Sequence, residues 1–288
     1  MKTATTLARL SADELRAALK LPAWVHPVLV LASRRLATVL ARFDDEVAHG
    51  ISGGGNGVPA AATRALAAFG ISCEVGGSGS LCDGAAIVLA NHPGAFDALA
   101  LFAAIGRDDV RVLALDRPFL AALPGLAKVL IPVPSDAVGR AVALRTARRH
   151  LAAGGLLLHF PAGAIEPDPA MDDRPHTYAP SWKPGLEVLL ADNTPIVLAC
   201  VAHVHHAAIE RSWPVAAARA RGVTLLGPLV ATWHARLAPK TVYVQFATTD
   251  ARTPLAAPFP ANSTTWPLRD AADALFDQVR ARFFPDAR

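Results

Sequence analysis

His92 and Asp97 are the residues whose types and spacing point most directly to chemistry. Four residues separate them in the stretch Asn91-His92-Pro93-Gly94-Ala95-Phe96-Asp97. A carboxylate beside an imidazole can bond one ring nitrogen, fix the tautomer and leave the other nitrogen to take a proton from a substrate. The pattern therefore predicts that His92 is a general base and Asp97 its orienting partner.

The flanking sequence indicates which elements hold this pair. The apolar run 85–90 is typical of a buried strand, Pro93-Gly94 predicts a turn, and the segment 96–102 predicts the start of a helix. His92 then follows the carboxyl end of a strand, where open α/β sheets place their sites. A purely structural interpretation stays open, with a histidine in a turn and an aspartate favoured by the helix dipole.

Three further blocks follow this first motif along the chain. They are Leu123-Pro124-Gly125-Leu126-Ala127-Lys128 running to Val133, then Leu156-Leu157-Leu158-His159-Phe160-Pro161-Ala162-Gly163, then Thr194-Pro195-Ile196-Val197-Leu198-Ala199. With Asn-His-x4-Asp after a buried strand, this order resembles the glycerolipid (lysophosphatidate-type) acyltransferase family. The resemblance covers roughly residues 85–201. It implies transfer of a fatty acyl group from acyl-CoA or acyl carrier protein to the hydroxyl of a lipid acceptor.

The chain departs from the family pattern in the half of the site that the resemblance assigns to the acceptor. Ala162 stands where the family has a Glu, and 132–135 stand where it commonly has an Arg. In this respect the chain is closer to the divergent bacterial branch of hemolysin-like and ornithine-lipid acyltransferases. Glu166 and Arg140 are candidate replacements. The substrate-binding residues that the resemblance implies are Asn91, Gly94, Phe96, Arg140, Pro161, Gly163 and Glu166.

The chemistry of such a transfer suits these residue types. A lipid hydroxyl attacks a thioester usefully only if a base takes its proton, and neutral histidine has the right basicity near neutral pH. No Gly-x-Ser-x-Gly elbow follows the pair, which favours direct transfer over a covalent acyl-enzyme. Backbone N–H groups from Gly94 to Phe96, at a helix N-terminus, are candidates to hold a CoA phosphate or an oxyanion. We expect neither a cofactor nor a metal.

Composition favours lipid over nucleic acid as a partner. Hydrophobic residues make up 52% of the 288 residues, charged residues 18%, and the mean hydropathy is +0.32. The net charge of +4 suits anionic lipid, CoA or acyl carrier protein, but it is too weak and dispersed to indicate nucleic acid. Three cysteines without metal spacing favour a reduced cytoplasm. We expect no signal peptide and no membrane-spanning helix, and a peripheral location on the cytoplasmic face of the cell membrane.

The chain divides into an N-terminal helical, possibly membrane-interfacial segment, 1–58, and an acyltransferase domain, 59–288. Ser11-Ala12-Asp13-Glu14 predicts a capping box that opens a short helix, and 21–43 has helical spacing with a basic flank. That second helix could lie in a membrane interface, with Trp24 near the headgroups, or pack against the core. The Gly-rich stretch 51–57 predicts a linker.

The second part alternates strands and helices. Strands are predicted at 72–75, 86–90, 110–114, 129–133, 156–160, 195–201, 223–226 and 241–247, and helices at 60–69, 96–105, 137–153, 182–191 and 270–284. This alternation predicts an α/β fold with a mixed, largely parallel sheet flanked by helices.

Two other functions stay open. His203-Val204-His205-His206, with Glu210 nearby, could hold the metal of a metal-dependent hydrolase, provided that the strand continues and places His203 and His205 on one face. The loss of the family's Glu at Ala162 also allows a catalytically silent lipid-binding protein. The intact pair of His92 and Asp97 argues against silence.

Overall fold

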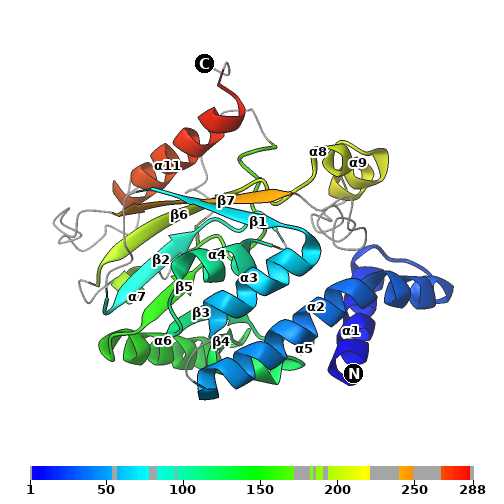
Figure 1. Ribbon diagram of the computed structural model, residues 1–288, viewed down its shortest axis with the longest axis horizontal. Coiled ribbons are helices and arrows are strands. Elements are labelled where there is room, and N and C mark those ends of the chain that lie inside the picture. Colours follow the sequence, from blue (N-terminus) through cyan, green and yellow to red (C-terminus); the bar gives the residue numbers. More distant parts are fainter. Residues whose placement is uncertain are drawn as a thin grey trace.

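The structure is a computed structural model, and it describes residues 2–53, 57–77, 83–94, 96–171, 182–183, 186–190, 194–220, 240–248 and 267–285. A seven-stranded sheet lies between layers of helices (Figure 1). Its strands are β1 (Ser72–Gly76), β2 (Ala86–Ala90), β3 (Val110–Leu115), β4 (Leu130–Val133), β5 (Leu156–His159), β6 (Ile196–Ala202) and β7 (Thr241–Thr248).

The strands follow the order β1-β7-β6-β2-β5-β3-β4 across the sheet. Among the described strands, β6 and β7 form the one antiparallel pair, and every other neighbouring pair is parallel. The predicted mixed, largely parallel sheet is confirmed.

Helices cover both faces of the sheet, as parallel strands require. All residues of β2 and β6 are buried, and their side chains alternate between two apolar cores. One core packs against α2 (His26–Gly53), α3 (Val58–Phe69) and α4 (Asp97–Ile105). The other packs against α6 (Ala137–Ala152), α7 (Leu186–Leu190) and α11 (Pro267–Phe283). The remaining short elements are α5 (Pro118–Ala121), η2 (Pro124–Lys128), α8 (Ala207–Glu210) and α9 (Trp213–Ala220).

The N-terminal helices differ from the prediction. The predicted capping box at Ser11 is wrong: α1 spans Lys2–Ala18, and Ser11 is buried in its middle. A short 3-10 helix, η1 (Ala23–Val25), precedes α2. That helix runs to Gly53, ten residues beyond the predicted end at 43, and takes in the first part of the predicted linker. The extra turns still have a partner to pack on, because Val47 is fully buried in the core beside α3.

The N-terminal segment shares its core with the rest of the protein. Ala37, Phe43 and Val47 of α2 belong to the same apolar cluster as α3 and α4. The Asp44 carboxylate accepts a hydrogen bond from the Leu126 N–H at 2.9 Å, which ties α2 to η2. Helix α3 begins at Val58, beside the predicted boundary. The division into 1–58 and 59–288 stays a prediction.

Most other predicted elements agree with the structure to within one to three residues. The strand predicted at 223–226 lies outside the described residues. Of the helix predicted at 182–191, the structure describes α7 at Leu186–Leu190, with the buried Trp182 ahead of it. None of the helices in the described ranges combines the length and apolar character needed to cross a bilayer.

Candidate active site

The site forms where three neighbouring parallel strands end. Because β6, β2 and β5 run side by side in one direction, the residues that follow them meet at one edge of the sheet. His92 follows β2, Phe160 follows β5, and the turn 203–205 follows β6. The sequence singled out all three segments, and the sheet order brings them together.

His92 and Asp97 form the predicted contact. The Nδ1 atom of His92 lies 2.7 Å from Oδ2 of Asp97, whose side chain is 1% exposed. The same oxygen accepts the Gly94 N–H at 2.9 Å, and Oδ1 accepts the Ala98 N–H at 2.6 Å, so the carboxylate is fixed. The side chain of His92 is 31% exposed, and within the described part of the chain its Nε2 has no hydrogen-bond partner. This nitrogen is available to a substrate.

The surroundings of His92 strengthen it as a base. Burial by itself would lower the pKa of His92, but the charge of Asp97 and its hydrogen bond outweigh that effect. Glu166 adds a second negative charge, whereas Arg117 opposes the two carboxylates. The net result is a pKa of His92 above its ordinary value of 6.5.

Backbone contacts hold the segment around His92. The Asn91 side chain bonds Val201 of β6 twice, with Nδ2 donating to the carbonyl at 2.9 Å and Oδ1 accepting the N–H at 2.7 Å. Oε2 of Glu166 accepts the His92 N–H at 2.9 Å, and the Glu166 N–H donates to the His92 carbonyl at 2.8 Å. Glu166 thus lies beside His92, as the sequence suggested, but it contacts the backbone there. Its role in substrate binding stays a prediction.

Several residues predicted to bind substrate have structural contacts within the protein. Asn91 is fully buried and bonds β6. Phe96 is 1% exposed and packs edge-to-face on Phe69. The Gly94 N–H donates to Asp97, and the prediction that the N–H groups from Gly94 to Phe96 hold a CoA phosphate or an oxyanion stays a prediction. Sequence reasoning missed these contacts because the partners are distant in the chain or are backbone atoms.

The third block forms one wall of the site. The Phe160 ring lies against the His92 ring, with centroids 4.7 Å apart. Pro161 is buried, and Ala162, 2% exposed, belongs to an apolar core, so the position of the family's Glu faces protein here. Gly163 is exposed with φ of 56°, a conformation that favours glycine, and its carbonyl accepts a hydrogen bond from Lys183 at 3.3 Å.

The cations are arranged differently from the prediction. Arg140 lies at the start of α6, after β4, and both β5 and β3 separate β4 from β2. Its guanidinium donates to the carbonyl of Ser135. Arg117, which sequence reasoning missed, follows β3 and is close enough to affect the pKa of His92. Its position two residues after the end of β3 was the available signal.

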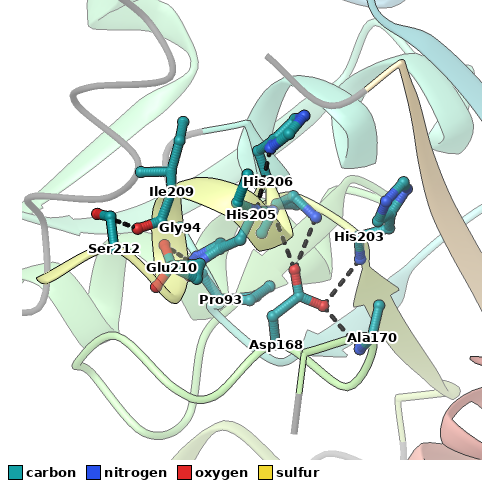
Figure 2. A network of polar contacts seen from close by, with 12 residues as sticks. Pro93, Gly94, Asp168, Ala170, His203, His205, His206, Ile209, Glu210 and Ser212 are labelled. Carbon is teal, nitrogen blue, oxygen red and sulfur yellow. Dashed lines mark hydrogen bonds and ion pairs between the residues drawn. The ribbon is translucent and has the colours of Figure 1, made fainter. Parts of the chain in front are cut away.

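The histidine cluster does not form the predicted arrangement. Strand β6 ends at Ala202, so the strand does not continue to place His203 and His205 on one face. Nδ1 of His203 lies 2.7 Å from the Thr241 carbonyl, whereas His205 contacts Glu210 and the Pro93 carbonyl (Figure 2). In the part of the chain that the structure describes, no group of three or more His, Cys, Asp or Glu residues is placed to hold a metal ion.

Comparisons with known proteins show a likeness among solved structures. The chain matches no protein-family model, and no curated protein is significantly similar to it in sequence. Among solved structures it is similar to the 1-acyl-sn-glycerophosphate (LPA) acyltransferase PlsC from Thermotoga maritima, at 14% sequence identity and a TM-score of 0.48. The likeness covers 88% of this chain and 82% of that one. A likeness at this level decides nothing about chemistry, so the function is inferred from the side chains of the site.

Proposed function

We propose that the protein is an O-acyltransferase that moves a fatty acyl group from acyl-CoA or acyl carrier protein to the hydroxyl of a lipid. One observation carries the proposal. His92 is bonded through Nδ1 to a buried carboxylate and presents Nε2 without a partner at the carboxyl edge of the sheet. A base that must take a proton from a weakly acidic hydroxyl needs this arrangement.

The transfer runs through His92. Its Nε2 takes the proton of the acceptor hydroxyl as the oxygen attacks the thioester carbonyl carbon. Asp97 stabilises the imidazolium that forms, and the buried location strengthens this interaction. The C–S bond then breaks, and the imidazolium returns its proton to the leaving thiolate. The one proton that moves goes from the acceptor hydroxyl through His92 to the leaving thiol, so the step balances with the groups named here.

Arg117 is our candidate for contact with an anionic substrate. Its side chain is exposed, makes no ion pair or hydrogen bond with the described residues, and lies within electrostatic reach of His92. A guanidinium can form two parallel hydrogen bonds to a phosphate group, which both CoA and a phosphorylated acceptor carry. Arg140, the cation that the motif order suggested, bonds its own loop at the far side of β5 and β3.

We further propose that the protein works at the cytoplasmic surface of the membrane. Trp24, Val28 and Leu31 lie on one line along η1 and the start of α2, and are 77%, 64% and 62% exposed. In Figure 1, the beginning of α2 and the helices that follow β6 lie toward the same side of the molecule. One of these helices, α9, begins at Trp213, which is 82% exposed. Apolar side chains beside the catalytic edge would let a lipid reach His92 from a membrane surface.

An acyl-transfer screen tests the proposed function. Labelled acyl-CoA and acyl carrier protein are offered with a panel of lysolipids, and products are read by mass spectrometry. We expect transfer by the wild type and a loss of at least about 10²-fold in His92→Ala, the usual effect of removing a general base. An active His92→Ala variant would refute the assignment. A wild type that binds lipid without any transfer would favour the silent lipid-binding protein.

A further inference from the structure

The turn after β6 is built around a buried carboxylate. Asp168 is 3% exposed, and its two oxygens accept four backbone N–H groups (Figure 2), those of Ala170, His203, Val204 and His205. Within this turn His203 has φ of 61°, a conformation that costs free energy in a residue with a side chain. Four hydrogen bonds to one carboxylate offset that cost. The turn is therefore held in one shape.

This shape directs the His205 ring toward the catalytic segment. His205 is 3% exposed, and its Nε2 lies 2.5 Å from the Pro93 carbonyl, the residue next to His92. Its Nδ1 lies 2.7 Å from Oε1 of Glu210, which is also buried. Glu210 ends α8, only five residues after His205, so one short segment supplies both members of the pair.

The hydrogen-bonding partners of the His205 ring show how many protons the ring and Glu210 hold together. A carbonyl oxygen only accepts hydrogen bonds, so Nε2 of His205 carries a hydrogen. Between Nδ1 and the Glu210 carboxylate there is one further proton, whichever atom holds it, and either placement leaves the pair neutral overall. Burial alone would lower the pKa of His205, but the hydrogen bond with Glu210 and the charges of Asp168 and Glu210 raise it. The surroundings of His205 thus favour the proton that lies between it and Glu210.

The contacts form a closed ring around His92. Glu166 bonds the His92 backbone, and Asp168, two residues later in the same loop, bonds the turn that carries His205. His205 then returns to Pro93. The side chains that make these hydrogen bonds, those of Glu166, Asp168 and His205, are buried, so water competes little with the bonds. This closed set of contacts holds the backbone of His92 in one position.

We propose that His205 and Glu210 are a positioning pair: His205 holds the Pro93 carbonyl so that the His92 ring keeps its bond to Asp97 and points Nε2 at the substrate. This inference rests on the proposed function, because it concerns His92 as the base. Neither residue touches the reacting atoms. Their contribution is to the orientation of His92, and a displacement of about 1 Å at a reacting group can reduce turnover by up to about 10²-fold.

Replacing His205 tests the positioning role. His205→Leu removes the donor to Pro93, and we expect kcat to fall about tenfold while KM for donor and acceptor stays within about twofold. His205→Gln places an amide N–H near the position of Nε2 and should restore most of kcat. The independent measurement is the titration of His92 by ¹⁵N NMR. In His205→Leu the pKa of His92 should move toward its ordinary value, because the bond to Asp97 loosens.

His150→Leu is the matched control. Nε2 of His150 also faces a backbone carbonyl, that of Leu156 at 3.1 Å, but at the opposite end of β5. This variant should lose stability in thermal unfolding and keep both kcat and the His92 titration. An equal fall of kcat in both variants would show a general effect of destabilisation and overturn the proposal. So would wild-type kcat and wild-type His92 titration in His205→Leu, or a His205→Gln variant no better than His205→Leu.

A second pair of variants covers the case in which His205→Leu does not fold. In Glu210→Gln the amide can donate to Nδ1, so His205 still donates from Nε2 to Pro93. In Glu210→Ala the ring loses its anchor. We expect kcat and the His92 titration of Glu210→Gln to be near those of the wild type, and those of Glu210→Ala to be altered. Equal kcat and equal His92 titrations in the two variants would overturn the proposal. If the wild type transfers no acyl group at all, the proposed function fails, and the NMR titrations still decide whether this pair positions His92.

Discussion

At the scale of single residues, the basicity of His92 results from opposing influences. Burial and the positive charge of Arg117 lower the pKa of this imidazole, and Asp97 and Glu166 raise it. A general base works only in its neutral form. The activity should therefore rise with pH through a pKa above 6.5.

The pH profile of Asp97→Asn follows from the same causes. The substitution removes the two largest influences that raise the pKa of His92, so the acid limb of kcat/KM should move to lower pH. Turnover should also fall by at least about 10²-fold, because asparagine does not stabilise the imidazolium. Rates measured over a pH series check both effects, with Asp45→Asn, an exposed carboxylate on α2, as the control. An unchanged acid limb would contradict the contact between His92 and Asp97.

Arg117 allows a second test at this scale. Arg117→Ala should raise KM for the anionic substrate about tenfold, the value of one charge-assisted hydrogen bond. It should also shift the acid limb to higher pH, because Arg117 lowers the pKa of His92. Arg140→Ala is the comparison, and we expect it to change neither quantity. Steady-state kinetics with phosphorylated and non-phosphorylated acceptors would show which cation meets which group. A larger effect at Arg140 would favour the arrangement that the motif order implied.

At the scale of elements, β5 ends with a histidine, His159. His159 lies at the end of the strand, and its buried Nδ1 has no hydrogen-bond partner in the described structure. Burial lowers the pKa of His159 to about 4. The strand holds a neutral imidazole that resists protonation.

The stability of the protein should therefore depend on His159 in mild acid. Between pH 6.5 and about 4 the unfolded chain binds a proton at this site and the folded chain does not, so the free energy of unfolding falls, by up to about 3 kcal/mol. Urea unfolding of the wild type and of His159→Leu at about pH 7 and about pH 5 measures the difference. The variant should lose less stability between these pH values. An equal loss in both proteins would show that His159 is already paired in the folded state.

His92 and His205 act in the opposite direction. Their pKa values are raised in the folded protein, so their contribution to stability is complete below about 6.5 and is lost as pH rises through the folded values. Variants of His205 and His159 should thus change the pH dependence with opposite signs.

The elements were predictable from the sequence where one local pattern determined them. The run 86–90 is apolar throughout and became β2, and the capping residue Asp136 accepts the Gly139 N–H at the start of α6. The contact of His92 with Asp97 was predictable because both lie in one short segment. The roles of Glu166, His205 and Arg117 were not, since they depend on the order of β6, β2, β5 and β3 in the sheet, which no local pattern encodes. The end of α2 was missed because its last turns form by packing against α3.

At the scale of the whole molecule, the exposed apolar side chains and the charge have a common explanation. Trp24, Val28 and Leu31 would otherwise face water, and a net charge of +4 favours an anionic surface. The opposite side of α2 packs on α3 and η2. The exposed apolar side chains are therefore additional to those that α2 already contributes to the core. Both features support the membrane attachment proposed above.

Vesicle sedimentation tests this attachment. Trp24→Ser combined with Leu31→Ser should weaken binding to anionic phospholipid vesicles at least about tenfold, because two apolar side chains lose their burial in lipid. Val188→Ser is the control, since Val188 is also exposed but lies on α7, at the other side of the view in Figure 1. Transfer to a soluble short-chain acceptor should be unchanged in both. Equal binding of all three proteins would exclude α2 as the attachment surface.

The ring of contacts around His92 also has a consequence for how the protein folds. His92 meets Glu166 across 74 residues of chain, and Pro93 meets His205 across 112. Closing such long loops is slow and comes after local helices form. A chain still on the ribosome, with β2 and α4 complete but α8 not yet made, has both His92 and Asp97 and lacks the parts that orient them. We expect acyl transfer to appear only with the last folding phase, and the His92 amide hydrogen to exchange with solvent only when the sheet opens.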